Sequence, residues 1–99
     1  MNASEIAFKA ADYIAKHGWC QGKLQDSEGK VCLEGAIMIV AGIAEIQSSE
    51  QAASTLIREL ISTTGSRGPL HYWNDHVAES AEDVILLLKQ AGHELEGKT

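Results

Sequence analysis

The most apolar run in the chain extends over residues 31–46, VCLEGAIMIVAGIAEI, and it carries only two charges, Glu34 and Glu45. A run of about four helical turns suits a helix better than a strand. On a helical wheel the two glutamates share one narrow stripe, with Met38 and Ala41 between them. Because so thin a polar stripe leaves most of the surface apolar, we expect a buried central helix on which the other elements pack.

Three further stretches show the apolar spacing of amphipathic helices, each between a capping residue and a stop signal. The caps and stops are Asn2 and Gly18 for the first, Ser48 or Ser49 and residues 63–65 for the second, and Ser80 and Gly92 for the third. We expect the tail, residues 93–99, to fray. The sequence therefore predicts a mainly α, four-helix compact domain around the buried central helix, a single domain over residues 1–99.

Two connectors separate these helices. In the first, residues 19–30, the segments 21–24 and 30–32 could pair as one short β-hairpin. The second, residues 65–77, reads GSRGPLHYWNDHV and is predicted to be a loop. Because so long a loop is unusual in a small domain, it indicates either function or packing over the edge of the core.

Gly35 and Gly42 both lie inside the predicted central helix. Each is expected to cost about 1 kcal/mol relative to alanine in a helix interior. Close approach of another backbone would offset that cost, so the two glycines are a candidate docking groove. The alternative is that burial in the core simply tolerates them.

Composition narrows the class of protein. The 99 residues are 44% hydrophobic, which is ordinary for a globular chain, and the net charge is −6. A negative surface disfavours nucleic acid and anionic membranes and would suit a basic partner. Charges interrupt the first helix, so no signal peptide is predicted, and residues 31–46 are too short to span a bilayer. We therefore expect a cytoplasmic protein with reduced thiols at Cys20 and Cys32; a homo-oligomer stays open.

Four short motifs occur in a fixed order along the chain. They are Gly18, Trp19 and Gln21; Cys32, Gly35 and Ala36; Trp73, Asn74 and Asp75; and Glu82, Asp83 and Val84. In this order and spacing the chain resembles a family of small uncharacterised proteins, a domain of unknown function, from high-GC Gram-positive bacteria and their phages. The resemblance covers most of the chain. It implies positions for a site but no activity.

The two connectors hold the candidate binding residues, which are Trp19, Gln21, Trp73, Asn74 and Asp75. They combine large apolar surfaces with hydrogen-bonding side chains, as protein interfaces do. A structural alternative is that the tryptophans pack over the core while Asn74 or Asp75 caps backbone amides. The function predicted from this pattern and from the acidity is a small intracellular protein-interaction module, related to phage proteins, that binds a protein partner.

The alternative function is a cysteine-dependent hydrolase or transferase. Cys32 stands where a helix N-terminus would lower a thiol pKa. Gln21 upstream could donate to an oxyanion, and His71 with Asn74 or Asp75 follows downstream, the order found in papain-type hydrolases. Such enzymes place the histidine on a sheet, however, and little strand is predicted here. A free cysteine is also commonly a buried core residue.

A metal site would need clustered ligands. Cys20, Cys32, His71 and His76 could supply four zinc ligands in principle, but neither the C-x-x-C nor the H-x-x-x-H spacing is present. We therefore predict no metal and no cofactor. The basic residues are scattered without interleaved aromatic residues, so no nucleic-acid partner is predicted either.

Overall fold

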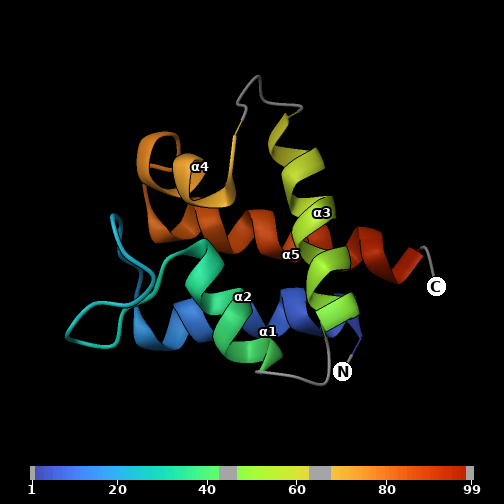
Figure 1. Ribbon diagram of the computed structural model, residues 1–99, viewed down its shortest axis with the longest axis horizontal. Coiled ribbons are helices and arrows are strands. Elements are labelled where there is room, and N and C mark those ends of the chain that lie inside the picture. The colour runs from blue at the N-terminus through green and yellow to red at the C-terminus, as the bar shows by residue number, and fades with distance from the viewer. Residues whose placement is uncertain (1, 43–46, 63–67, 98–99) are drawn as a thin grey trace.

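The computed structural model describes residues 2–42, 47–62 and 68–97. Within these ranges the chain forms five helices and no sheet, so the mainly α prediction is confirmed (Figure 1). The helices are α1 (Ala3–His17), α2 (Leu33–Ala41), α3 (Gln47–Ser62), α4 (Leu70–His76) and α5 (Ala81–Gly97). The four-helix arrangement is not confirmed, because α4 lies within the connector that was predicted to be a loop.

The most extensive helix–helix packing in the described structure is between α1 and α5, which lie alongside each other and run in opposite directions (Figure 1). The predicted ends of α1 are confirmed: the Asn2 side chain accepts from the amide of Glu5, and Gly18 ends the helix with a φ of 99°. Ser80 precedes α5 as predicted, and its hydroxyl accepts from the amide of Asp83. Side chains from these two helices supply much of the buried core.

The predicted stop at Gly92 is wrong, because α5 continues to Gly97 and buries Leu95. A Cβ built on Gly92 would lie 2.7 Å from the ring of Phe8. The absence of a side chain at Gly92 therefore leaves room for the Phe8 ring of α1 to pack on α5. The Phe8 ring also meets His93 edge to face, with centroids 5.0 Å apart. Residues 93–97 are therefore helix rather than the predicted frayed tail; residues 98 and 99 lie outside the described ranges.

The start of α3 also differs from its prediction. The helix begins at Gln47, so Ser48 and Ser49 lie in its first turn rather than at the N-cap. Its last residue is Ser62, and the predicted stop at residues 63–65 lies outside the described residues.

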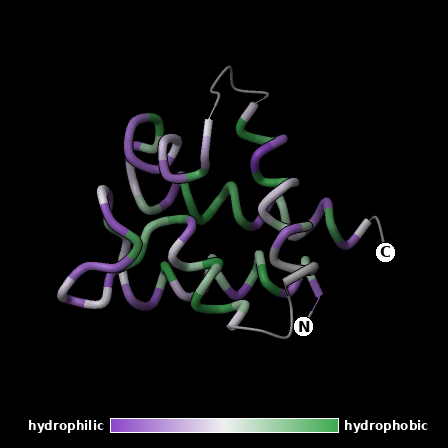
Figure 2. The backbone as a smooth tube through the Cα atoms, in the orientation of Figure 1, coloured by the Kyte–Doolittle hydropathy of each residue, from purple (hydrophilic) through white to green (hydrophobic). Residues whose placement is uncertain are grey.

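The central helix is confirmed over Leu33–Ala41, while residues 43–46 lie outside the described ranges. It contacts α1, α3 and α4, but it is buried on one side only. Met38 and Ile39 are 45% and 42% exposed, whereas Ala41, which the helical wheel placed on the polar stripe beside Met38, is buried. Figure 2 shows how hydrophobic α2 is as a whole. A 99-residue chain cannot bury every apolar side chain, so part of the α2 surface stays exposed. The core is formed by α1 and α5 together with the buried side of α2. No helix in the described ranges is long and apolar enough to cross a membrane.

The two glycines differ in role, because Gly35 lies inside α2 whereas Gly42 follows its last residue. At Gly35 a Cβ would lie 2.1 Å from the carbonyl oxygen of Leu24, which confirms the close approach of another backbone. That backbone belongs to the same chain and already covers the glycine. Gly42 follows the last residue of α2 and ends it with a φ of 76°, a conformation that glycine adopts without strain.

The first connector is held by hydrogen bonds centred on Val31. Cys20 donates its amide to the carbonyl of Val31 at 3.0 Å, and Val31 donates to the carbonyl of Gly18 at 3.1 Å. The bridges here are isolated ones, Trp19 with Val31 and Gln25 with Val31. The predicted hairpin is therefore not confirmed. Val31 pairs with both Trp19 and Gln25, so neither of these two segments forms a regular two-stranded ladder with it.

Helix α4 follows Pro69, the only proline of the sequence. Proline suits a helix N-terminus because its φ is already helical and it has no amide hydrogen to satisfy. Leu70, Trp73 and Asn74 are spaced three and four residues apart, and all three are buried. This short buried face packs α4 against α2 and α3. The connector that was predicted as a loop thus places Trp73, Asn74 and Asp75 on a helix.

Candidate functional site

Asn74 joins the two connectors. Its side chain is fully buried, and its Oδ1 accepts from the Trp19 indole at 2.7 Å and from the amide of Leu33 at 2.9 Å. Its Nδ2 donates to the carbonyl of Cys20 at 3.1 Å and to Asp75 Oδ1 at 2.9 Å. Every hydrogen-bonding position of the amide is therefore used. The two connectors converge, and a single side chain ties both of them to the start of α2.

Gln21 caps the C-terminal end of α4. Its Nε2 lies 3.0 Å from the carbonyl oxygen of Asn74, 3.1 Å from that of Asp75 and 3.5 Å from that of Ala78. The last carbonyls of a helix have no partner within the helix. Gln21 therefore acts as a C-terminal cap for α4, supplied by a segment more than fifty residues away in the sequence.

Asp75, near the end of α4, binds the first connector through its side chain. Its Oδ1 accepts from the amide of Gly22 at 2.9 Å, as well as from the Asn74 side chain. The hydrogen bond from Gly22 is the main reason why the pKa of Asp75 lies below its ordinary value; the bond from Asn74 adds to it and partial burial opposes it. Asp75 is consequently a carboxylate at neutral pH.

The five predicted binding residues are thus close together, but four of them form hydrogen bonds with one another and with the backbone around them. We call Trp19, Gln21, Asn74 and Asp75 the clamp. Trp73, the fifth, is 7% exposed and belongs to the core. The Asn74 side chain has no exposed surface and Trp73 has little, so neither can form much of a contact surface. The clamp fixes the positions of neighbouring residues.

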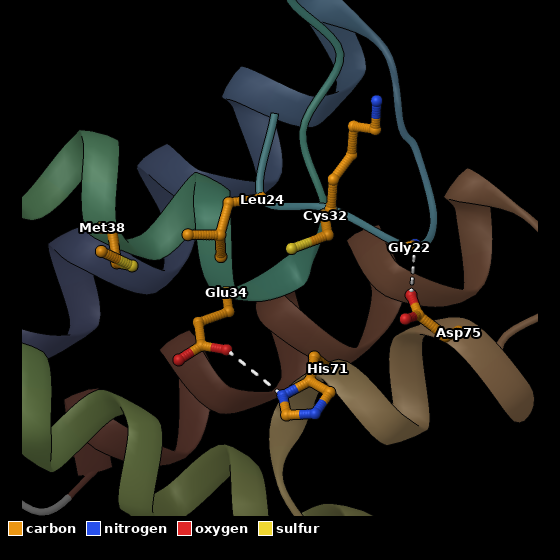
Figure 3. Close-up of a pocket in the computed structure, with 8 residues that line it drawn as sticks. Gly22, Leu24, Cys32, Glu34, Met38, His71 and Asp75 are labelled. Carbon is orange, nitrogen blue, oxygen red and sulfur yellow. Dashed lines mark hydrogen bonds and ion pairs between the residues drawn. The ribbon is translucent and has the colours of Figure 1, made fainter. Parts of the chain in front are cut away.

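Next to the clamp lies a pocket of about 430 Å³, within the size range of ligand sites (Figure 3). Its lining consists of Gly22, Lys23, Leu24, Cys32, Glu34, Met38, His71 and Asp75. A smaller depression of about 130 Å³ adjoins it, sharing Leu24 and Met38 and adding Gln25, Gly35 and Ile39. Together these two depressions form what we call the α2 groove.

Cys32 is the N-cap of α2, and its Sγ accepts from the amide of Gly35 at 3.3 Å. The residue is only 2% exposed. Burial raises the pKa of the Cys32 thiol, and the charges of Glu34 and Asp75 add to that rise; hydrogen bonds from the backbone of Gly35 and Glu34 oppose it. Burial and the two carboxylates therefore outweigh the helix N-terminus, and the predicted lowering of this pKa is wrong.

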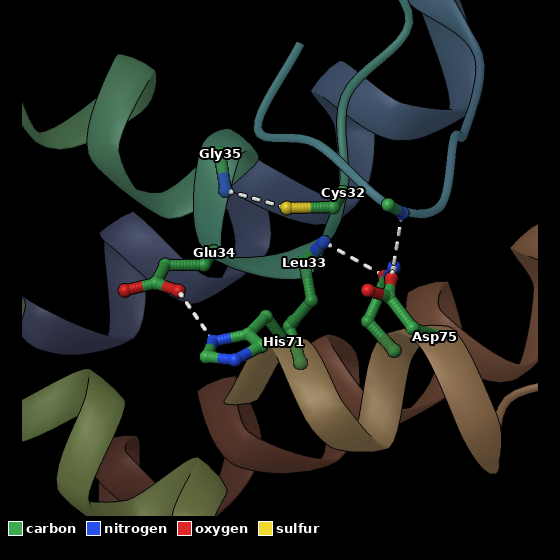
Figure 4. A network of polar contacts seen from close by, with 8 residues as sticks. Cys32, Leu33, Glu34, Gly35, His71 and Asp75 are labelled. Atoms are coloured by element: carbon green, nitrogen blue, oxygen red, sulfur yellow. Dashed lines mark hydrogen bonds and ion pairs between the residues drawn. The ribbon is translucent and has the colours of Figure 1, made fainter. Parts of the chain in front are cut away.

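His71 and Asp75 line the same pocket as Cys32, yet the three do not form a relay (Figure 4). The Nδ1 of His71 faces Glu34 Oε2 at 3.8 Å, and its ring is largely exposed. Asp75 Oδ1 is bonded to Gly22 and Asn74. Within the described residues no hydrogen bond joins His71 to either Cys32 or Asp75. Gln21 uses its amide to cap α4, and Asn74 is buried in the clamp.

Within the described ranges, no group of three or more histidine, cysteine, aspartate or glutamate side chains could hold a metal ion. Cys20, Cys32, His71 and His76 are thus not gathered into such a group. The Cys20 thiol instead lies 3.5 Å from the Lys23 carbonyl and 3.4 Å from the Lys30 carbonyl. Burial is the main reason why its pKa is raised, and the charge of Asp26 contributes.

Sequence reasoning named Cys32, His71 and Asp75 as candidates for one site but missed the apolar lining of the α2 groove, which consists of Leu24, Met38 and Ile39. One signal was present: Met38 lies between Glu34 and Glu45 on the polar stripe of the run, where an apolar side chain faces outward. Nothing in the sequence indicated that Leu24 would lie beside it, because that depends on the path of residues 19–30.

A family model described as "Family of unknown function (DUF6197)" matches residues 1–94. No curated protein and no solved structure matches the chain.

Proposed function

This chain belongs to the Family of unknown function (DUF6197), a membership that carries no activity, and we propose that the protein is a small protein-interaction module. The partner would bind in the α2 groove. The resemblance to proteins of high-GC Gram-positive bacteria and their phages extends the proposal, so that the partner would be a bacterial or phage protein met inside the cell.

The observation that supports this proposal most directly is the gathering of exposed apolar side chains in the groove. Leu24, Met38 and Ile39 are each more than 40% exposed and line two adjoining depressions. Single exposed apolar residues are normal on a protein surface, whereas a contiguous group in a concave site marks a binding surface.

The clamp supports the groove from one side. It fixes residues 19–22 against α4, and the Leu24 carbonyl receives the amide of Cys32 at 3.2 Å. Leu24 and His71 are therefore held on opposite walls without needing a partner to order them. A preformed site loses less conformational entropy on binding, which favours affinity.

The proposal predicts that Met38→Asp abolishes partner capture. Placing an unpaired charge in an apolar contact should weaken binding by more than about tenfold, since 1.4 kcal/mol corresponds to a factor of ten. Tagged wild-type and variant proteins would be crosslinked in lysate of the source organism, and captured proteins would be quantified by mass spectrometry. At least one protein should be recovered with the wild type and lost with the variant.

Leu86→Asp is the matched control, because Leu86 is 56% exposed on α5 and lines neither depression. It should capture the same protein as the wild type. Circular dichroism would show that both variants are folded. If no captured protein distinguishes Met38→Asp from Leu86→Asp, the groove is not a protein-binding site.

A cysteine-dependent hydrolase or transferase is the second candidate, favoured by one observation: Cys32, His71 and Asp75 line one pocket. The electrostatics oppose it, because burial and two nearby carboxylates keep the Cys32 thiol protonated. A nucleophile of this kind needs a base within hydrogen-bond reach, and no described residue provides a base hydrogen-bonded to the Cys32 thiol.

Thiol labelling distinguishes the two candidates. In a Cys20→Ser background, we expect Cys32 to react with a small disulfide reagent at neutral pH at least about tenfold more slowly than in denaturant. Because its pKa is raised, the rate should keep climbing as pH rises above the range where an ordinary thiol has already ionised. His71→Ala should leave the rate unchanged. Rapid labelling at pH 7 that depends on His71 would instead support catalysis.

A further inference from the structure

We infer that the α2 groove selects a peptide segment in which an apolar side chain stands beside a lysine or arginine. This inference rests on the proposed function and names the chemistry of the partner. The apolar side chain would lie against Leu24 and Met38, and the basic group would lie near Glu34 and Asp75.

The arrangement of the pocket separates an apolar end from an acidic one. In Figure 3, Met38 and Leu24 lie at one end and Asp75 at the other, with Glu34 and His71 along the wall between them. A ligand that fills the pocket therefore meets both kinds of surface. An apolar segment without a charge would leave the acidic end unmatched.

Both carboxylates keep an oxygen available. Asp75 uses Oδ1 for both of its hydrogen bonds, and no described residue bonds its Oδ2. The contact of Glu34 is with His71 at 3.8 Å, longer than an ordinary hydrogen bond, and the Glu34 side chain is 41% exposed. A guanidinium or ammonium group could therefore approach either carboxylate without first breaking a strong bond.

The charge of the lining favours a cation. The lining holds two carboxylates, Glu34 and Asp75, and one lysine, Lys23, and the whole chain carries a net charge of −6. Such a field attracts a basic partner and repels an acidic one. The same charge opposes a second copy of this chain as the occupant.

The shape of the groove favours a stretch of polypeptide over a compact molecule. The second depression shares Leu24 and Met38 with the first and adds Gln25, Gly35 and Ile39 to the lining. An extended segment can place successive side chains in both depressions, as peptide grooves commonly allow.

Display of random heptapeptides on immobilised protein tests this inference. Selections would run in parallel against the wild type, Met38→Asp, Glu34→Gln and Glu82→Gln. Glu82 is an exposed glutamate of α5 outside both depressions, so its variant carries the same charge change as Glu34→Gln. We expect the wild type and Glu82→Gln to enrich peptides that pair an apolar residue with a nearby lysine or arginine.

The best peptide would then be measured by fluorescence anisotropy. Glu34→Gln should weaken its binding by about 1.5-fold to fivefold, the range expected for a partly exposed charge pair. Glutamine in place of the basic residue of the peptide should have the same effect. The two changes together should cost less than their sum, and added salt should weaken the wild-type complex more than the Glu34→Gln complex.

The outcomes separate the inference from the proposed function. Enrichment of apolar or acidic peptides that depends on Met38 but not on Glu34 would overturn the inference and leave the interaction module standing. Peptides that bind wild type and Met38→Asp alike, or no enriched peptides at all, would overturn both.

Discussion

Replacing Asn74 with alanine is expected to lower the free energy of unfolding by about 3–5 kcal/mol, the sum of several lost contacts at about 1–3 kcal/mol per buried group left without a partner. The amide has no exposed surface, and its Oδ1 serves the Leu33 amide and the Trp19 indole. Both donors would lose their acceptor, and the Cys20 carbonyl would lose a donor. For a domain of this size that is a large share of the total stability.

Urea unfolding followed by circular dichroism measures this loss. Gln90→Ala is the matched control, because it removes an exposed amide of α5 and should change the stability by less than about 0.5 kcal/mol. Asn74→Asp is informative as well, since its carboxylate would face the Cys20 carbonyl and Asp75. That variant should be least stable at neutral pH and recover in mild acid. A loss below about 1 kcal/mol for Asn74→Ala would show that the clamp is not built as described.

The same variant links stability to function. The clamp positions residues 19–22 and α4 on either side of the pocket, so its loss should loosen both walls. Partner capture by Asn74→Ala should therefore fall even at temperatures where the protein is still largely folded. The residues named as binding residues from the sequence would then affect binding through the positions of Leu24, His71 and Glu34.

The second large effect is expected for Gly35→Ala. A methyl group there would lie 2.1 Å from the Leu24 carbonyl oxygen, which belongs to the backbone and cannot rotate away. The connector would have to shift, breaking the hydrogen bond between the Cys32 amide and Leu24. Overpacking of this kind typically costs 1–3 kcal/mol and occasionally more, and alanine recovers about 1 kcal/mol of helix propensity. The lost hydrogen bond adds about 1 kcal/mol, so a net destabilisation of about 1–3 kcal/mol should follow, measured by thermal or urea unfolding.

Gly97→Ala provides the control, since Gly97 is helical and a Cβ there meets nothing within 4 Å. It should be neutral or stabilising by up to about 1 kcal/mol. Because Leu24 lines both depressions, Gly35→Ala should also weaken partner capture, whereas Gly97→Ala should not. Equal stabilities for the two variants would mean that residue 24 does not lie against α2 in solution.

Local signals predicted both ends of α1 and the start of α5, because the information for each lies within a few residues of that end. Asn2 caps α1 through its own side chain, and Gly18 ends it with a left-handed φ. At Gly92 the same reasoning failed, because the reason for that glycine is the Phe8 ring on another helix. A glycine that ends a helix and a glycine that makes room for a neighbouring side chain cannot be told apart from the sequence.

The candidate site shows a similar division. Trp19, Gln21, Asn74 and Asp75 were identified as unusual, and the structure brings them together. Their role could not be predicted, because it depends on which partners each finds across more than fifty residues of chain. Helix α4 was missed since its apolar face is short and its aromatic residues resembled a binding loop.

The sequence by itself determined the mainly helical class, the ends of α1, the start of α5 and the acidity of the surface, because each follows from neighbouring residues or from composition. Only the tertiary structure decided that Asn74 is a buried connection, that Cys32 is held as a protonated thiol and that Leu24 lies beside Met38. These depend on distances between segments far apart in the chain, and hydrogen bonding, burial and electrostatics all act through such distances.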